Sequence, residues 1–127
     1  MRTEPFNEAG CLEDFRKLLA VDSTTGQYEA LQDLLCGMLD SMGYPYRVTR
    51  QGGVIADLGG EGHPLVVTAH LDDIGLMVRH VNADGTLKVC PVGGLYPFYC
   101  VTENVRVYTR AARSTPGRSA GPRTPST

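Results

Sequence analysis

Residues 65–78 read LVVTAHLDDIGLMV and decide the fold. Residues 65–69 are apolar on both faces, and a strand without a polar face belongs in the middle of a covered sheet. In open α/β sheets ligands bind beyond the ends of the strands, so the polar residues that follow are candidates for chemistry. Because His70 and Asp72 are two residues apart on an extended chain, they are expected to project to the same side.

His70 and Asp72 are residue types that suit a metal site. A neutral imidazole is a good ligand for zinc or cobalt, with a Zn–N bond of about 2.0–2.1 Å. A carboxylate beside it holds the other ring nitrogen, fixes the tautomer and raises the basicity of the ligand. The pair by itself does not assign a metal, because histidines at strand ends have other uses.

Asp73 follows directly, and neighbouring residues of a strand point to opposite faces. The two carboxylates therefore diverge, which argues against the facing pair of a glycosidase. We expect Asp73 to accept an N–H group or to be solvated.

Helices are predicted before this stretch and strands around it. One helix is capped by Asn7, and a second begins at a capping box of Thr24 and Gln27 and ends at Gly43. The alternation of residues predicts strands at 46–49, 54–58, 65–69, 74–81, 86–89 and 101–109, with a hairpin turn at 82–85. The expected fold class is α/β, with two N-terminal helices followed by a mixed β-sheet.

Composition limits the classes of function. The 127 residues carry 12 basic and 14 acidic side chains, a net charge of −2 that argues against nucleic acid as the main partner. No run of about 18 apolar residues occurs, so we expect no membrane span. The first residues lack the apolar core of a secretory signal, and the four cysteines form no C-x-x-C pair. We therefore expect reduced thiols and a cytoplasmic protein.

Residues 111–127 differ from the rest of the chain. They read AARSTPGRSAGPRTPST, with three Arg and no acidic, aromatic, Leu, Ile or Val residue. Such a segment buries too little apolar surface to offset its ordering entropy, so we predict a disordered basic tail. A basic arm for an anionic surface is the alternative.

The sequence motifs resemble those of one peptidase family. Residues 67–78 resemble the A-H-[ML]-D-E-[IV]-G-L-M-V block of the glutamyl aminopeptidase/endoglucanase-like metallopeptidases, also called tetrahedral aminopeptidases. Three further segments resemble the family's G-N-V-I-A, D-G-x-L and P-[IV]-G-G motifs in the same order, at 52–56, 84–87 and 91–94. The resemblance covers roughly residues 10–110.

This resemblance implies a phosphorylase/hydrolase-like catalytic domain around a two-metal site, with zinc or cobalt, that removes N-terminal residues from peptide substrates. By motif position, His70 matches the first metal ligand and Asp72 the catalytic aspartate that orients it. The family inserts a β domain used in assembly around Asp73. The expected domains are therefore an incomplete catalytic domain at 1–73, the start of the inserted β domain at 74–110 and the tail at 111–127. The family forms homo-oligomers, which we do not expect of this chain.

Two departures from the family pattern affect the expected function. Asp73 stands where the family usually has Glu, which keeps the charge and shortens the reach. The family's other ligands and its general base lie further downstream than this chain extends, and a catalytic zinc needs about three protein ligands. We therefore expect a truncated or frameshifted family member that is inactive alone. A non-catalytic binding or assembly module that retains the fold, and a structural fragment without function, are the alternatives.

Overall fold

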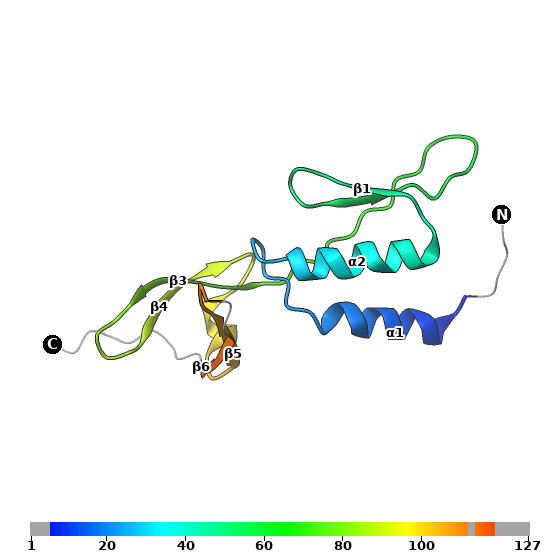
Figure 1. The fold of residues 1–127 in the computed structure, drawn as a ribbon. Helices are drawn as coiled ribbons and strands as arrows, with labels where there is room; N and C mark the ends of the chain where they lie inside the picture. Colours follow the sequence, from blue (N-terminus) through cyan, green and yellow to red (C-terminus); the bar gives the residue numbers. More distant parts are fainter. Residues whose placement is uncertain (1–5, 112–113, 119–127) are drawn as a thin grey trace. The chain divides into compact units, whose positions relative to one another are not determined.

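The computed structural model describes residues 6–111 and 114–118, and Figure 1 shows its elements in order. The chain divides after Asp73 into two compact units, which we call the first and second unit. The expected assignment of 1–73 to a catalytic domain and 74–110 to an inserted β domain stays a prediction. The elements are α1 Glu8–Leu19, α2 Glu29–Met42, β1 Tyr46–Val48, β2 Val54–Ala56, β3 Gly75–Val81, β4 Leu87–Val92, the 3-10 helix η1 Pro97–Cys100, β5 Asn104–Tyr108 and β6 Ser114–Arg118.

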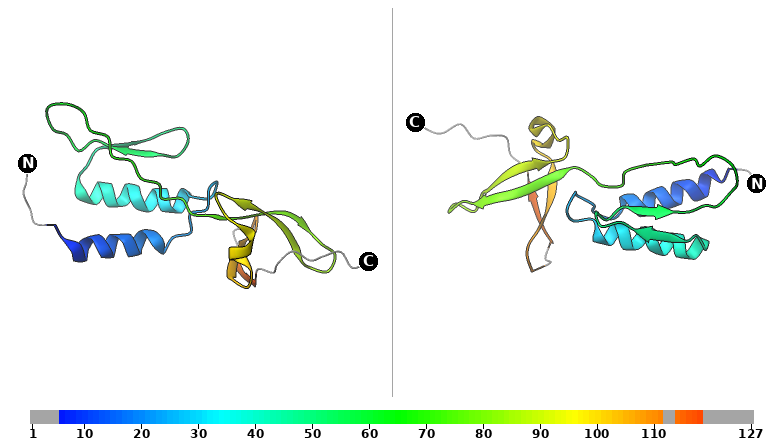
Figure 2. Two further views of the ribbon diagram at one scale, coloured as in Figure 1. Left: turned by 180° about the vertical axis from the view of Figure 1, so that it is seen from behind. Right: turned by 90° about the horizontal axis from the view of Figure 1, so that it is seen from above.

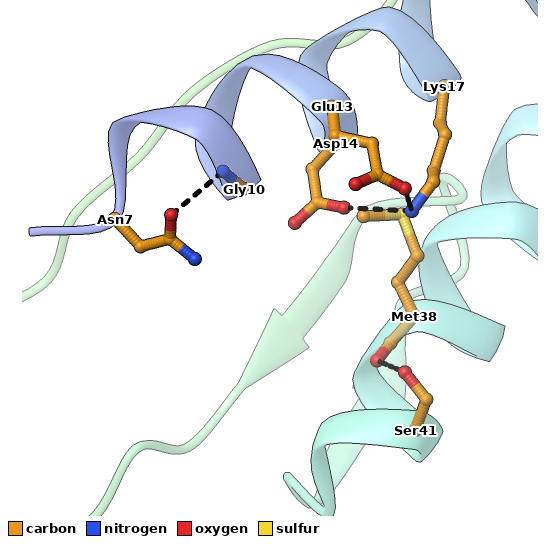
Figure 3. Close-up of polar contacts among 7 residues, drawn as sticks. All are labelled: Asn7, Gly10, Glu13, Asp14, Lys17, Met38 and Ser41. Carbon is orange, nitrogen blue, oxygen red and sulfur yellow. Dashed lines mark hydrogen bonds and ion pairs between the residues drawn. The ribbon is translucent and has the colours of Figure 1, made fainter.

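Helix α1 is fixed by local polar contacts, which Figure 3 shows. The side chain of Asn7 accepts a hydrogen bond from the main-chain N of Gly10 at 3.0 Å, which confirms the predicted cap. One turn further along, Lys17 Nζ lies 2.9 Å from Glu13 Oε1 and 3.3 Å from Asp14 Oδ1. Residues three and four apart are neighbours on a helix surface, so these pairs need no contact from elsewhere in the chain.

The start of α2 differs from the prediction. The helix begins at Glu29, its N-cap Tyr28 makes no side-chain cap hydrogen bond, and the capping box is wrong. Thr24 instead forms an isolated parallel bridge with Asp73, and its carbonyl accepts the main-chain N–H of Gln27 at 2.7 Å. The bridge holds Thr24 in an extended conformation, so the helix starts only after the following turn.

The end of α2 agrees with the prediction. Ser41 Oγ donates to the carbonyl of Met38 at 2.7 Å (Figure 3), and Gly43 follows in the left-handed conformation, with φ of 75°. The chain then turns back into β1. Helix α2 lies between α1 and the β1–β2 hairpin and contacts both (Figures 1 and 2).

The core of the first unit is small and centres on α2. Leu31 is the one apolar side chain that is buried in the described part of the chain, at 3% exposure. Four other large apolar residues of α2 are half-buried: Leu34, Leu35, Met38 and Leu39. On α1, the large apolar side chains of Leu12, Phe15 and Leu19 are exposed. Packing around α2 therefore carries most of this core.

Strands β1 and β2 form the predicted hairpin. Their antiparallel register pairs Tyr46 with Ala56 and Val48 with Val54. The turn is closed by a hydrogen bond from the main-chain N of Thr49 to the carbonyl of Gly53 at 2.8 Å. Strand β2 ends at Ala56, two residues before the predicted end.

The prediction of a buried central strand at 65–69 is wrong for this structure. The segment lies in no strand, and Leu65, Val66 and Val67 are each at least 80% exposed. A central strand needs hydrogen-bonding neighbours on both edges and cover on both faces. No strand of residues 6–111 and 114–118 pairs with this segment, so its apolar side chains face solvent.

The second unit consists of two hairpins. Strands β3 and β4 pair antiparallel, with an irregularity between Val78 and His80, and the main-chain N of Asn82 donates to the carbonyl of Thr86 at 2.8 Å in the turn. This confirms the predicted hairpin. Strands β5 and β6 pair antiparallel from Asn104↔Arg118 to Tyr108↔Ser114.

Strand β6 corrects the prediction of a disordered tail for residues 114–118. A strand at a sheet edge is held by main-chain hydrogen bonds to β5, which do not require apolar side chains, and an edge position tolerates Pro116. The remainder of the predicted tail, 112–113 and 119–127, lies outside the described residues.

The mixed α/β class is confirmed. The strands form three two-stranded antiparallel sheets rather than one mixed sheet, and the parallel pairing seen in the described residues is the bridge between Thr24 and Asp73. Within the same residues, neither α-helix is long and apolar enough to span a bilayer.

Leu31→Ala is expected to destabilise the first unit by about 2–5 kcal/mol, because it removes buried methyl groups and leaves a cavity. Urea unfolding followed by far-ultraviolet circular dichroism measures the loss, since both α-helices belong to this unit. The control is Leu19→Ala, at an exposed position of α1, which should change stability by no more than about 0.5 kcal/mol. Equal losses in the two variants would contradict a core centred on α2.

Candidate functional site

The candidate site lies in the first unit, where residues 71–73 run beside residues 23–25. The main-chain N of Asp73 donates to the carbonyl of Ser23 at 2.9 Å, and Ser23 Oγ donates to the carbonyl of Leu71 at 3.0 Å. The bridge between Thr24 and Asp73 joins the same two segments, and Ser23 is 5% exposed. We call this set of contacts the 23–25/71–73 junction.

His70 and Asp72 are brought together beside this junction. His70 Nδ1 lies 3.3 Å from Asp72 Oδ1 and 3.1 Å from the main-chain carbonyl of Asp72. A carbonyl oxygen only accepts, so in the neutral ring Nδ1 carries the proton and Nε2 keeps its lone pair. The imidazole is 86% exposed, which leaves Nε2 accessible to a ligand. The two side chains share one side as predicted, although residues 70–72 form no strand.

Thr25 completes the contacts of the carboxylate. Its Oγ1 donates to Asp72 Oδ2 at 2.8 Å, so one carboxylate oxygen faces Thr25 and the other faces His70. The hydrogen bond from Thr25 is the main reason that the pKa of Asp72 lies below its ordinary value. Partial desolvation opposes this effect, while a backbone hydrogen bond and the neighbouring His70 add to it. Asp72 is therefore held as a carboxylate, the form that accepts Nδ1–H.

A cavity of about 360 Å³ adjoins the pair. Four parts of the chain make its wall. They are Thr25 and Tyr28 before α2, Leu31, Gln32 and Leu35 of α2, residues 51–54 at the turn between β1 and β2 and the start of β2, and residues 69–72. The volume is within the range of about 300–1,000 Å³ that small-molecule sites occupy. The site thus sets an imidazole beside a partly apolar hollow.

The side chains of Tyr28, the N-cap residue of α2, and of Gln32 within α2 hold the turn that walls this cavity. Tyr28 Oη donates to the carbonyl of Gln51 at 3.1 Å, and Gln32 Nε2 donates to the carbonyl of Gly52 at 2.6 Å. The ring of Tyr28 lies so close to Gly52 that a Cβ there would come within 2.7 Å of Tyr28 Oη. Glycine is required at this position by both the contact and its φ of +85°.

The donor set fits one ligand position of a metal centre. Within residues 6–111 and 114–118, no group of three or more His, Cys, Asp or Glu side chains is placed to hold a metal ion. His63 and His80 are exposed, and the four cysteines form no disulfide. In the described residues, His70 is the histidine for which contacts of a ring nitrogen are seen, with Asp72 at Nδ1.

Two residues of the site, Ser23 and Thr25, are not among the site residues predicted from the sequence. The available signal was the run of short hydroxyl side chains at 23–25, which in a loop often bond to distant or local polar groups. Nothing in their spacing identifies Asp72, 47 positions away, as the acceptor.

Comparison with known proteins identifies the family. The family model described as M42 glutamyl aminopeptidase matches residues 52–121. This chain belongs to that family. The family resemblance inferred from the motifs is thereby confirmed, and with it membership in a group of hydrolases. The match also extends into 111–121, which the sequence assigned to an unrelated tail.

Two curated relatives illustrate the similarity. The chain is 32% identical over 98 residues to a lysyl aminopeptidase from Pyrococcus furiosus, covering 76% of this chain and 28% of that protein. It is 28% identical over 109 residues to a glutamyl aminopeptidase from Lactococcus lactis, covering 84% of this chain and 31% of that protein.

The solved structure of an aminopeptidase from the archaeon Desulfurococcus kamchatkensis is similar in fold. It superimposes with a TM-score of 0.73 at 29% identity, covering 83% of this chain and 30% of that chain. The chain thus spans about 30% of the length of the proteins it matches. The expectation of a truncated or frameshifted product stays a prediction.

Asp72 is expected to titrate below the ordinary aspartate value of 3.8. A pKa that is lower in the folded than in the unfolded chain means that ionised Asp72 stabilises the fold above pH 3.8. This contribution is lost as the pH falls through the lower folded value. The side-chain carboxyl ¹³C shift of Asp72, followed against pH, gives the midpoint. The same titration in denaturing urea is the control, and a folded midpoint at or above the urea value would contradict the geometry.

Gly52→Ala is expected to loosen the turn over the cavity, because the new methyl group collides with Tyr28 in a backbone conformation that L-residues disfavour. Gly26→Ala is the matched control, since Gly26 has a φ of +89° but open space around it. The control should cost about 1–2 kcal/mol from backbone strain alone, and Gly52→Ala should cost more in urea unfolding. Equal costs would show that the Tyr28 contact is unimportant.

Proposed function

We propose that this chain is the N-terminal portion of a metal-dependent aminopeptidase, in which His70 binds a divalent metal ion and Asp72 orients its imidazole. The observation that carries the proposal is the pair of contacts from Nδ1 of His70 to Asp72, at 3.3 and 3.1 Å. They direct Nε2 away from Asp72, as in a histidine ligand supported by a carboxylate. The motif block around His70 and the family membership support the same assignment.

The substrate class that follows is a peptide with a free N-terminus, from which the terminal residue is removed. Zinc and cobalt are the ions that suit an imidazole ligand, with two ions in the complete family site. When bound, they supply activation of a water molecule and polarisation of the peptide carbonyl. The residues of this chain contribute the first ligand, its orientation through Asp72 and one wall of a hollow beside it.

We also propose that the 127-residue chain does not hydrolyse peptides alone. A catalytic zinc takes about three protein ligands, and the described residues bring together no group of that size. A cytoplasmic location and the absence of homo-oligomers are parts of the same proposal. The four free cysteines in the described chain support the location, because a reducing compartment keeps thiols unpaired.

Zinc and cobalt titrations of the purified chain test the ligand assignment. We expect weak binding by calorimetry that falls at least about tenfold in His70→Ala and by about 10–100-fold in Asp72→Ala, whose side chain supports the ligand. His80→Ala in β3 is the matched control and should bind as the unaltered chain does. Loss of binding in His80→Ala but not in His70→Ala would overturn the assignment.

The same preparations test catalysis with lysyl and glutamyl p-nitroanilides. We expect no hydrolysis above the metal-only blank. Stoichiometric, tight metal binding together with peptidase activity would contradict an incomplete site. Cooperative unfolding with no metal binding would favour a non-catalytic binding or assembly module.

A further inference from the structure

Thr25 has no role in the function proposed above, yet its side chain makes a direct contact with the site. Its Oγ1 donates to Asp72 Oδ2 at 2.8 Å, across 47 positions of sequence. The other carboxylate oxygen, Oδ1, faces His70 Nδ1 at 3.3 Å. The three side chains therefore form a chain from hydroxyl to carboxylate to imidazole, all within the first unit.

We propose that Thr25 is a positioning residue, which fixes the rotation of the Asp72 carboxylate and thereby keeps His70 in the Nδ1–H form with Nε2 free for a metal ion. This inference rests on the proposed function in one respect: it takes a metal ion to be the ligand that binds Nε2 of His70. The contacts that define the positioning are independent of any metal.

The three residues 23–25 make different contacts with residues 71–73, and this difference supports the role of Thr25. Ser23 joins the two segments through its hydroxyl bond to Leu71 and its carbonyl, and Thr24 joins them through the bridge with Asp73. The side chain of Thr25 is directed at the carboxylate of Asp72 rather than at the main chain. Its removal should therefore leave the two segments joined and release only the carboxylate.

Exposure explains why the carboxylate needs an anchor. The side chains of Asp72 and His70 are 44% and 86% exposed, so water competes for both. An exposed contact between two side chains is weakly held in one geometry, because the mobility of the side chains opposes it. A second hydrogen bond on the opposite oxygen limits the rotation of the carboxylate and makes one orientation prevail.

The main-chain carbonyl of Asp72 is the competing explanation. It lies 3.1 Å from Nδ1 and could hold the proton there without the side chain. The experiment must therefore distinguish the effect of the Asp72 carboxylate on the tautomer from that of the Asp72 main-chain carbonyl. Asp72→Ala does this, because it removes the carboxylate and keeps the carbonyl.

The test measures the tautomer of His70 in the metal-free chain. Long-range ¹H–¹⁵N spectra are recorded about two pH units above the ordinary histidine pKa of about 6.5, where the neutral ring is observed. The spectrum of His70→Gln assigns the signals, and His63 and His80 serve as internal references. In the unaltered chain we expect the Nε2 shift of a nitrogen without a proton and the Nδ1 shift of a protonated one.

Four variants give the expected pattern. In Thr25→Val and in Asp72→Ala, the two ¹⁵N shifts of His70 should move toward each other as the Nε2–H form gains population. Thr25→Ser keeps the hydroxyl and should restore the original shifts. Ser23→Ala weakens the junction without touching the carboxylate, so it should lower the unfolding midpoint and leave the His70 shifts unchanged.

Three results would overturn the proposal. Unaltered His70 shifts in Asp72→Ala would show that the main-chain carbonyl alone sets the tautomer. Unaltered shifts in Thr25→Val would show that Asp72 needs no anchor. Equal changes in Ser23→Ala and Thr25→Val would show that any loosening of the junction acts on the ring.

Zinc added to the unaltered chain separates this proposal from the proposed function. If the variant pattern is obtained but zinc leaves the His70 signals unchanged, the positioning by Thr25 stands and the metal-ligand assignment fails. If zinc shifts the Nε2 signal equally in the unaltered chain and in Thr25→Val, with identical tautomers, the ligand assignment stands and the positioning fails.

Discussion

The hydrogen bond from the main-chain N of Asp73 to the carbonyl of Ser23, at 2.9 Å, is the constraint on which the first unit depends. It joins the loop after α1 to the residues that lead into β3, and the hydroxyl of Ser23 adds a second bond to Leu71. Closing a loop of this length has an entropic cost that a single exposed contact would not offset. Ser23 is 5% exposed, so these bonds form largely out of water, where they contribute more.

This junction also explains how a site exists without the strand that was expected to carry it. Residues 65–69 are exposed and lie in no strand, so they give His70 no rigid support. The orientation of the imidazole comes instead from Asp72 on its C-terminal side. Asp72 in turn is adjacent to the residue that the junction fixes. The contacts that orient His70 therefore come from residues 71–73, which follow it, and not from the apolar residues 65–69, which precede it.

The features predicted from sequence are those decided by a few neighbouring residues. The cap at Asn7, the left-handed Gly43 and the hairpin turn at 82–85 each depend on contacts within about four positions. The failures depend on partners far along the chain. Thr24 was assigned to a helix cap because its bridge to Asp73 has no local signal, and Thr25 was overlooked for the same reason.

The two strand errors have a related cause. The apolar residues at 65–69 indicate a strand that needs cover on both faces and pairing on both edges. They do not show whether neighbouring strands are present to pair with it. Residues 114–118 show the reverse, because β6 is held by main-chain hydrogen bonds to β5 that composition does not reveal. In both cases the composition indicates whether the side chains favour burial. It does not indicate whether another strand is available to form main-chain hydrogen bonds with the segment.

The chain spans about 30% of its relatives' length, and within it the contacts of Asp72 with Nδ1 set the direction of the His70 imidazole. A histidine that must select its tautomer and ring orientation on binding loses part of the binding free energy to that ordering. In the proposed roles of Thr25 and His70, the contacts from Thr25 through Asp72 to His70 lower this cost. On the proposal that His70 is a metal ligand, this segment supplies a donor whose direction is set independently of the other ligands.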